Sequence, residues 1–91
     1  MDLQQRIVTF AGNVQGVGFR YTACIAARGY NVAGYVKNLP DGGVECLAEG
    51  DSNEIDAFLT ELCGRMQSHI RSKNEVTAPW SGHYESFGVR Y

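Results

Sequence analysis

The sequence of 91 residues has no excess of basic residues, no long apolar run and no closely spaced cysteines. Eight lysines and arginines against ten aspartates and glutamates give a formal charge of −2, so no basic surface for nucleic acid is expected. No apolar run approaches the roughly 18 residues of a membrane span, and the first residues do not form a charged-then-apolar leader. We therefore expect a cytoplasmic protein without a nucleic-acid or membrane partner.

The three cysteines, Cys24, Cys46 and Cys63, are far apart and form no C-x-x-C pair. A zinc site needs closely spaced ligand pairs, so no metal site is expected. The spacing favours buried or half-buried thiols and leaves one disulfide open, because sequence does not measure the distances that a disulfide needs. The remaining titratable residues are interpreted as surface histidines (His69, His83) and as turn, strand-face and cap carboxylates (Asp41, Glu45, Glu49, Asp51).

Apolar and β-branched runs bounded by turn formers predict five strands. The predicted strands span residues 6–11, 32–37, 44–50, 75–80 and 86–91. Residues 38–43 are dense in turn formers and are expected to reverse the chain. Pro79 is expected to stop the fourth strand, and residues 67–74 carry a poor signal that predicts a loop.

Two helices are predicted, at residues 19–28 and 51–64. The first is rich in alanine and meets Gly29, a residue type that is common just after a helix. Asp51 and Glu54 form a capping-box pattern at the start of the second helix. This helix places six apolar residues on one face: Ile55, Phe58, Leu59, Leu62, Cys63 and Met66.

The resulting order is β-α-β-β-α-β with an additional terminal strand. It predicts an α+β fold, a ferredoxin-like sandwich whose mixed, mostly antiparallel sheet carries two helices on one face. The length predicts a single domain over residues 1–91, and we expect a monomer. A right-handed crossover returns the second strand parallel to the first, so Arg20 and Asn38 are expected at one rim of the sheet.

The run Gly12–Arg20 (GNVQGVGFR) lies between the first strand and the first helix. Such a loop turns several backbone N–H groups toward one point, the helix N-terminus adds positive potential, and the arginine adds a planar fork of donors. The run matches neither the P-loop pattern G-x-x-x-x-G-K-[ST] nor the dinucleotide pattern G-x-G-x-x-G. A small phosphoryl group held without a metal fits it better.

Asn38 offers an acceptor oxygen and two N–H donors, and it is expected to hold a water in line with the phosphorus. Asparagine is a poor general base, so this arrangement suits only a substrate with a good leaving group. A carboxyl-phosphate mixed anhydride meets that condition, because its leaving carboxylate needs little protonation.

Residues 12–21 and 34–45 resemble the two signature blocks of the acylphosphatase family, and residues 84–91 resemble the family's C-terminal pattern. The resemblance implies hydrolysis of acyl phosphates to carboxylate and inorganic phosphate, without a metal or cofactor. It implies that Arg20 binds the phosphate and that Asn38 positions the attacking water. It also implies a phosphate-binding loop formed by Gln15, Gly16, Val17, Gly18 and Phe19. Tyr35 stands where many members carry tryptophan, which is expected to affect packing more than chemistry.

Three other functions stay open. A non-catalytic module that holds an anionic metabolite would use the same loop, although Asn38 at the rim favours turnover. RNA-recognition domains share the element order, but the third strand here has no aromatic residue and two acids. The chain also resembles the acylphosphatase-like module of larger carbamoyl-transfer proteins, against which its length argues.

Overall fold

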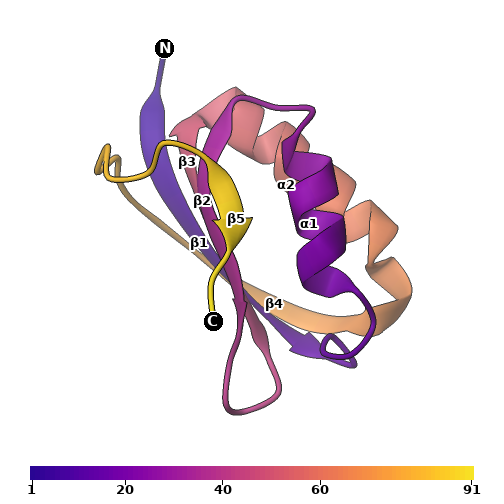
Figure 1. Ribbon diagram of the computed structural model, residues 1–91. Coiled ribbons are helices and arrows are strands. Elements are labelled where there is room, and N and C mark those ends of the chain that lie inside the picture. Colours follow the sequence, from indigo (N-terminus) through magenta and orange to yellow (C-terminus); the bar gives the residue numbers. More distant parts are fainter.

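The sheet has the strand order β4-β1-β3-β2-β5, and both helices pack on one of its faces (Figure 1). The computed structural model describes all residues, 1–91. The strands are β1 (Leu3–Gly12), β2 (Val32–Asn38), β3 (Val44–Asp51), β4 (Ile70–Pro79) and β5 (Phe87–Val89). The helices are α1 (Phe19–Ala27) and α2 (Ser52–Arg65), and the short 3-10 helix η1 (Gln67–His69) follows α2.

The strand pairing confirms the predicted ferredoxin-like, mostly antiparallel sheet. β3 is antiparallel to both β1 and β2, so β1 and β2 run parallel with β3 between them. At the two edges, β4 is antiparallel to β1 and β5 is parallel to β2. The end of β1, the start of α1 and the end of β2 therefore lie at one rim of the sheet. Neither helix has the length and apolar character of a membrane span.

The core lies between the sheet and the two helices. Strand alternation directs Val8 and Phe10 of β1 toward the helices, and their exposed fractions are 1% and 0%. The predicted apolar face of α2 packs against this side of the sheet with Ile55, Phe58 and Leu62 fully buried. Each such side chain stabilises the fold by roughly 1.5–3 kcal/mol relative to its exposed state, so this face holds α2 on the sheet.

Most predicted elements agree with the structure, but the predicted loop at residues 67–74 is wrong. β4 begins at Ile70, and Pro79 is its last residue. β4 is an edge strand that pairs only with β1, and eight of its ten residues are exposed. A strand with both faces in contact with water needs no alternating apolar pattern, so residues 70–74 give no strand signal, whereas the strand predicted at residues 75–80 agrees with the second half of β4. β5 is shorter than the predicted run 86–91.

The predicted capping box at the start of α2 is also wrong. Asp51 occupies the N-cap position with an extended backbone, but its Oδ1 accepts a hydrogen bond from the N–H of Asp2 at 2.9 Å. Glu54 Oε1 accepts a hydrogen bond from the N–H of Asn31 at 2.8 Å. The two carboxylates therefore connect the start of α2 to the start of β1 and to the turn before β2.

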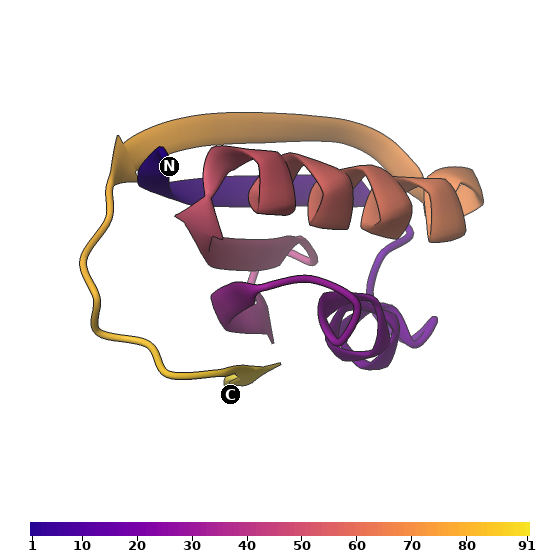
Figure 2. The ribbon, with the colours of Figure 1, turned by 90° about the horizontal axis from the view of Figure 1, so that it is seen from above.

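Residues 80–86, the crossing segment, run from β4 past the inner strands to β5 (Figure 2). Glu49 of β3 lies on a strand face, as interpreted, but it is 2% exposed and binds this segment. Its carboxylate accepts hydrogen bonds from Gln5 Nε2, from the N–H and hydroxyl of Ser81 and from the N–H of Gly82, at 2.6–3.1 Å. Burial alone raises the pKa of Glu49, but these hydrogen bonds outweigh burial and lower the pKa below its ordinary value.

A cluster of aromatic rings forms a second attachment of the crossing segment. The ring centroids of Tyr84 and Tyr35 are 5.9 Å apart, and the guanidinium carbon of Arg90 lies 4.1 Å from the Tyr35 centroid. The Tyr35 hydroxyl donates to Glu45 at 2.7 Å. Backbone bonds from Gly34 N–H to the Ser86 carbonyl and from Arg90 N–H to the Val36 carbonyl hold β5 against β2.

All three cysteines are free thiols, so the disulfide that the sequence left open is not formed. Cys46 is fully buried, and Cys24 and Cys63 are half-buried. Burial raises the pKa of Cys46 and of Cys24, so both thiols stay protonated at neutral pH.

Candidate active site

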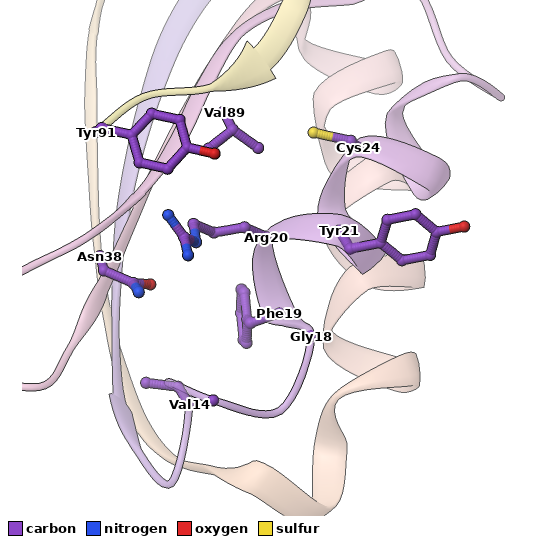
Figure 3. Close-up of a pocket in the computed structure, with 10 residues that line it drawn as sticks. Val14, Gly18, Phe19, Arg20, Tyr21, Cys24, Asn38, Val89 and Tyr91 are labelled. Atoms are coloured by element: carbon purple, nitrogen blue, oxygen red, sulfur yellow. The ribbon is translucent and has the colours of Figure 1, made fainter.

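A pocket of about 330 Å³ opens at the rim where β1, α1 and β2 meet (Figure 3). Arg20 and Asn38 both line it, although 18 positions separate them in the sequence. The full lining is Val14, Gly16, Gly18, Phe19, Arg20, Tyr21, Cys24, Asn38, Val89 and Tyr91. The structure thus brings together the two polar side chains that the element order places at one rim.

Two glycines set the path of the loop between β1 and α1. Gly16 and Gly18 have φ angles of 77° and 78°, in the left-handed region, whereas no other residue type in the chain has a positive φ. A Cβ atom at either position meets nothing within 4 Å, so the backbone conformation and not a lack of space requires glycine. Alternation of left-handed glycines with ordinary residues turns successive N–H groups toward one side, as in anion-binding concavities.

The backbone N–H groups of residues 14–21 donate no hydrogen bond to any group of the protein. The N–H groups on either side of this run are used: Asn13 donates to the His69 carbonyl at 3.0 Å and Thr22 donates to the Gly18 carbonyl at 2.9 Å. The run covers the loop and the first turn of α1, where the helix dipole is positive. A continuous set of free donors therefore lies beside the pocket.

Arg20 adds the only full positive charge in the lining of the pocket. The side chain is half-buried, and no carboxylate forms an ion pair with it. Its guanidinium carbon lies 5.2 Å from the centroid of the Tyr91 ring. The helix dipole makes the potential at the first turn of α1 positive, which disfavours a cation there. The charge of Arg20 adds to this positive potential.

Asn38 is the last residue of β2 and pairs with Val44 across the hairpin to β3. Figure 3 shows its side-chain amide directed into the pocket, on the side of the Arg20 head group. No hydrogen bond within the protein uses this amide, because neither its oxygen nor its nitrogen has a partner. Its oxygen and its N–H groups are therefore both available to a ligand or to water.

Two of the predicted loop residues contribute no side chain to the pocket lining. The Gln15 side chain points to the β2–β3 turn, where its Nε2 donates to the carbonyls of Leu39 and Gly43, both at 2.8 Å. Val17 packs against the core. Gly16, Gly18 and Phe19 do line the pocket, so the structure places three of the five predicted loop residues there. Gln15 instead joins the loop to the turn that follows Asn38.

Sequence analysis did not identify the side of the pocket formed by Cys24, Val89 and Tyr91. Cys24 lies four residues after Arg20, a spacing that puts both side chains on one face of α1. β5 pairs parallel with β2 through Val36 and Val89, which brings Tyr91 level with Asn38. Only the Arg20–Cys24 spacing is visible in the sequence; the parallel pairing of β5 is a tertiary contact.

The topology and the pocket define a ferredoxin-like α+β protein with a glycine-lined, positively charged pocket at one rim of its sheet. The family model for acylphosphatase matches residues 6–89. The chain is 45% identical over 82 residues to the acylphosphatase of Archaeoglobus fulgidus, a match that covers 89% of this chain and 91% of that relative. The chain therefore belongs to the acylphosphatase family and is a hydrolase of that family.

Solved structures of two acylphosphatases are also similar to this chain. The acylphosphatase of Bacillus subtilis is similar with a TM-score of 0.82 and 33% identity, and the match covers 98% of this chain and 99% of that chain. The acylphosphatase of Coxiella burnetii is similar with a TM-score of 0.85 and 31% identity, and the match covers 98% of this chain and 94% of that chain.

Proposed function

We propose that the protein hydrolyses the carboxyl-phosphate bond of acyl phosphates, with Arg20 and the loop N–H groups binding the phosphoryl group and Asn38 positioning the water. One observation carries this proposal: free backbone donors, an unpaired arginine and an unpaired asparagine amide meet in a single pocket. The family membership supports the activity, and the geometry suggests a role for each group.

The phosphoryl group carries three equatorial oxygens whose charge must be stabilised during transfer. The guanidinium of Arg20 offers a planar pair of donors to two of these oxygens, and the N–H groups of the loop offer single donors to the third. Donors that a loop holds in place before substrate binds need little reorganisation in the transition state.

Asn38 holds the attacking water through its side-chain oxygen. The water oxygen forms a bond to phosphorus while the bond from phosphorus to the carboxylate oxygen breaks. The proton of the water passes to a phosphoryl oxygen, the nearest base, because asparagine does not accept it. The carboxylate leaves without protonation, which explains how a pocket without an acidic side chain in its lining supports turnover.

Benzoyl phosphate hydrolysis in the presence of EDTA tests the activity. The wild type is expected to turn over, and Arg20→Ala is expected to show no turnover above the uncatalysed rate, because the single full charge of the pocket is lost. Arg65→Ala is the matched control: Arg65 is exposed on α2 and pairs only with Glu61, so its loss is expected to leave the rate unchanged.

The alternative of a non-catalytic anion-binding module gives a different result in the same experiment. A module of that kind binds inorganic phosphate through Arg20 and hydrolyses nothing. We expect instead that phosphate acts as a competitive inhibitor of turnover. Phosphate binding to the wild type without any hydrolysis of benzoyl phosphate would favour the binding module over the enzyme.

A further inference from the structure

The pocket continues along α1 beyond Arg20. Cys24 lies one helical turn after Arg20 and on the same face of the helix. Val89 of β5 lines the pocket from the sheet edge, and Figure 3 shows the sulfur of Cys24 directed toward Val89. These two side chains form an apolar wall next to the guanidinium of Arg20.

This apolar wall is accessible and uncharged. Val89 is 39% exposed and Cys24 is half-buried, so a ligand in the pocket can cover both side chains. A neighbouring pocket begins on the other side of Cys24 and extends between α1 and β5 past Ala27 and Phe87. A group larger than the phosphoryl group therefore has room along this direction.

In-line displacement determines the direction in which the substrate extends. The attacking and leaving oxygens lie on opposite sides of the phosphorus. Figure 3 shows Asn38 on one side of Arg20 and Cys24 on the other. With the water held by Asn38, the leaving carboxylate and its acyl group point along α1 toward the wall of Cys24 and Val89.

We propose that Cys24 and Val89 bind the acyl group and that they select acyl phosphates whose acyl group is apolar, aromatic or branched aliphatic. The proposal rests on the proposed function. An aromatic acyl group removes the wall from water when it binds, whereas an acetyl group is too small to cover it. Selection by the wall acts on substrate binding and therefore on KM more than on kcat.

Benzoyl phosphate and acetyl phosphate differ in the size of the acyl group and release carboxylates of similar basicity. The wild type is expected to have a lower KM for benzoyl phosphate. The double variant Cys24→Ser/Val89→Thr replaces apolar atoms of the wall by hydroxyls of nearly the same size. It is expected to raise KM for benzoyl phosphate by roughly 3- to 10-fold, with kcat changed by less than about 2-fold and a smaller effect on acetyl phosphate.

Val76→Thr is the matched control, because Val76 is 50% exposed on β4 and outside the pocket; no constant is expected to change. Val89→Thr alone, at a partly exposed position, gives a second test if the double variant unfolds. An equal rise of KM for both substrates, or no rise for benzoyl phosphate, overturns the acyl-binding role and leaves the proposed function standing. Absence of turnover of both substrates by the wild type overturns the proposed function and the acyl-binding role together.

Discussion

Arg20 and Asn38 contribute different things to the same pocket. In the proposed mechanism, Arg20 supplies positive charge to the phosphoryl group in both the ground state and the transition state. Asn38 is neutral and, in the proposed mechanism, contacts the water and not the bound phosphate. The loss of either side chain should therefore affect binding and turnover in different proportions.

Asn38→Ala is expected to reduce kcat by about 10²-fold or more, by analogy with the loss of one positioned polar group in an active site. The inhibition constant of inorganic phosphate is expected to stay close to the wild-type value, because Arg20 and the loop still bind the anion. Steady-state kinetics with phosphate as inhibitor measures both. Asn74→Ala on the exposed face of β4 is the control. A variant that keeps its rate and loses phosphate affinity would show that Asn38 binds phosphate instead.

Gly18→Ala tests the left-handed backbone of the loop. The φ angle of Gly18 is 78°, which costs a residue with a Cβ atom about 1–2 kcal/mol. We expect a loss of this size in the free energy of unfolding, or a loop that relaxes and binds phosphate more weakly. Urea unfolding and phosphate inhibition measure the two outcomes.

Gly64→Ala is the opposite control for this change. Gly64 lies in α2 with an ordinary φ, and a Cβ atom there also meets nothing within 4 Å. We expect this variant to be more stable by about 0.5–1 kcal/mol, because alanine favours a helix more than glycine does. Equal effects of the two substitutions would show that backbone conformation at Gly18 is not the reason for its glycine.

At the scale of elements, Gln15 joins the loop to the β2–β3 turn. Gln15→Ala removes two hydrogen bonds to backbone carbonyls, which is expected to lower the free energy of unfolding by about 1–3 kcal/mol. Because the loop and Asn38 lie on either side of this contact, KM is expected to rise as well. Chemical unfolding and steady-state kinetics measure the effects, and exposed Gln67→Ala is the control. A stability loss without any change in KM would limit Gln15 to a structural role.

Element order was predictable because the main elements carry strong local signals. The face of Ile55, Phe58 and Leu62 defines α2, and glycines and turn formers mark where the elements end. The first half of β4, residues 70–74, escaped prediction because an exposed edge strand has no apolar alternation. The predicted capping box does not form, because the carboxylates of Asp51 and Glu54 accept hydrogen bonds from Asp2 and Asn31. The local sequence does not reveal these tertiary partners.

The positions of the two polar side chains in the site were predictable from the element order, but the rest of the pocket lining was not. Crossover topology alone places Arg20 and Asn38 at one rim, and the structure puts both in one pocket. The side chain of Gln15 turns away because two carbonyls of a distant turn accept its hydrogen bonds. Val89 and Tyr91 enter the pocket through the pairing of β5 with β2, and no local pattern encodes which strand β5 joins.

At the scale of the whole molecule, Glu49 links the centre of the sheet to the crossing segment. Its lowered pKa means that ionised Glu49 stabilises the fold. This contribution is fully present above the unfolded carboxyl pKa of about 4.3 and is lost as the pH falls through the lower folded pKa. The crossing segment is therefore held most firmly near neutral pH.

Glu49→Gln is expected to lower the free energy of unfolding at pH 7 by about 1–3 kcal/mol, because an amide cannot accept all of the hydrogen bonds that the carboxylate accepts. The difference between wild type and variant is expected to shrink as the pH falls below about 4.3. Urea unfolding at several pH values measures it. Glu85→Gln, in an exposed residue of the crossing segment, is the control. A difference that does not depend on pH would remove the assigned role of the ionised form.

The free N–H groups beside the pocket also bear on how the product leaves. Backbone dipoles act over short distances, and Arg20 is the single full positive charge in the pocket lining, within a molecule whose formal charge is −2. An anion in contact with the loop meets both the backbone donors and the charge of Arg20, whereas the formal charge of the whole molecule gives an anion no net long-range attraction. Inorganic phosphate that has moved out of the loop is therefore not drawn back by the charge of the whole molecule, which favours release of the product in the proposed reaction.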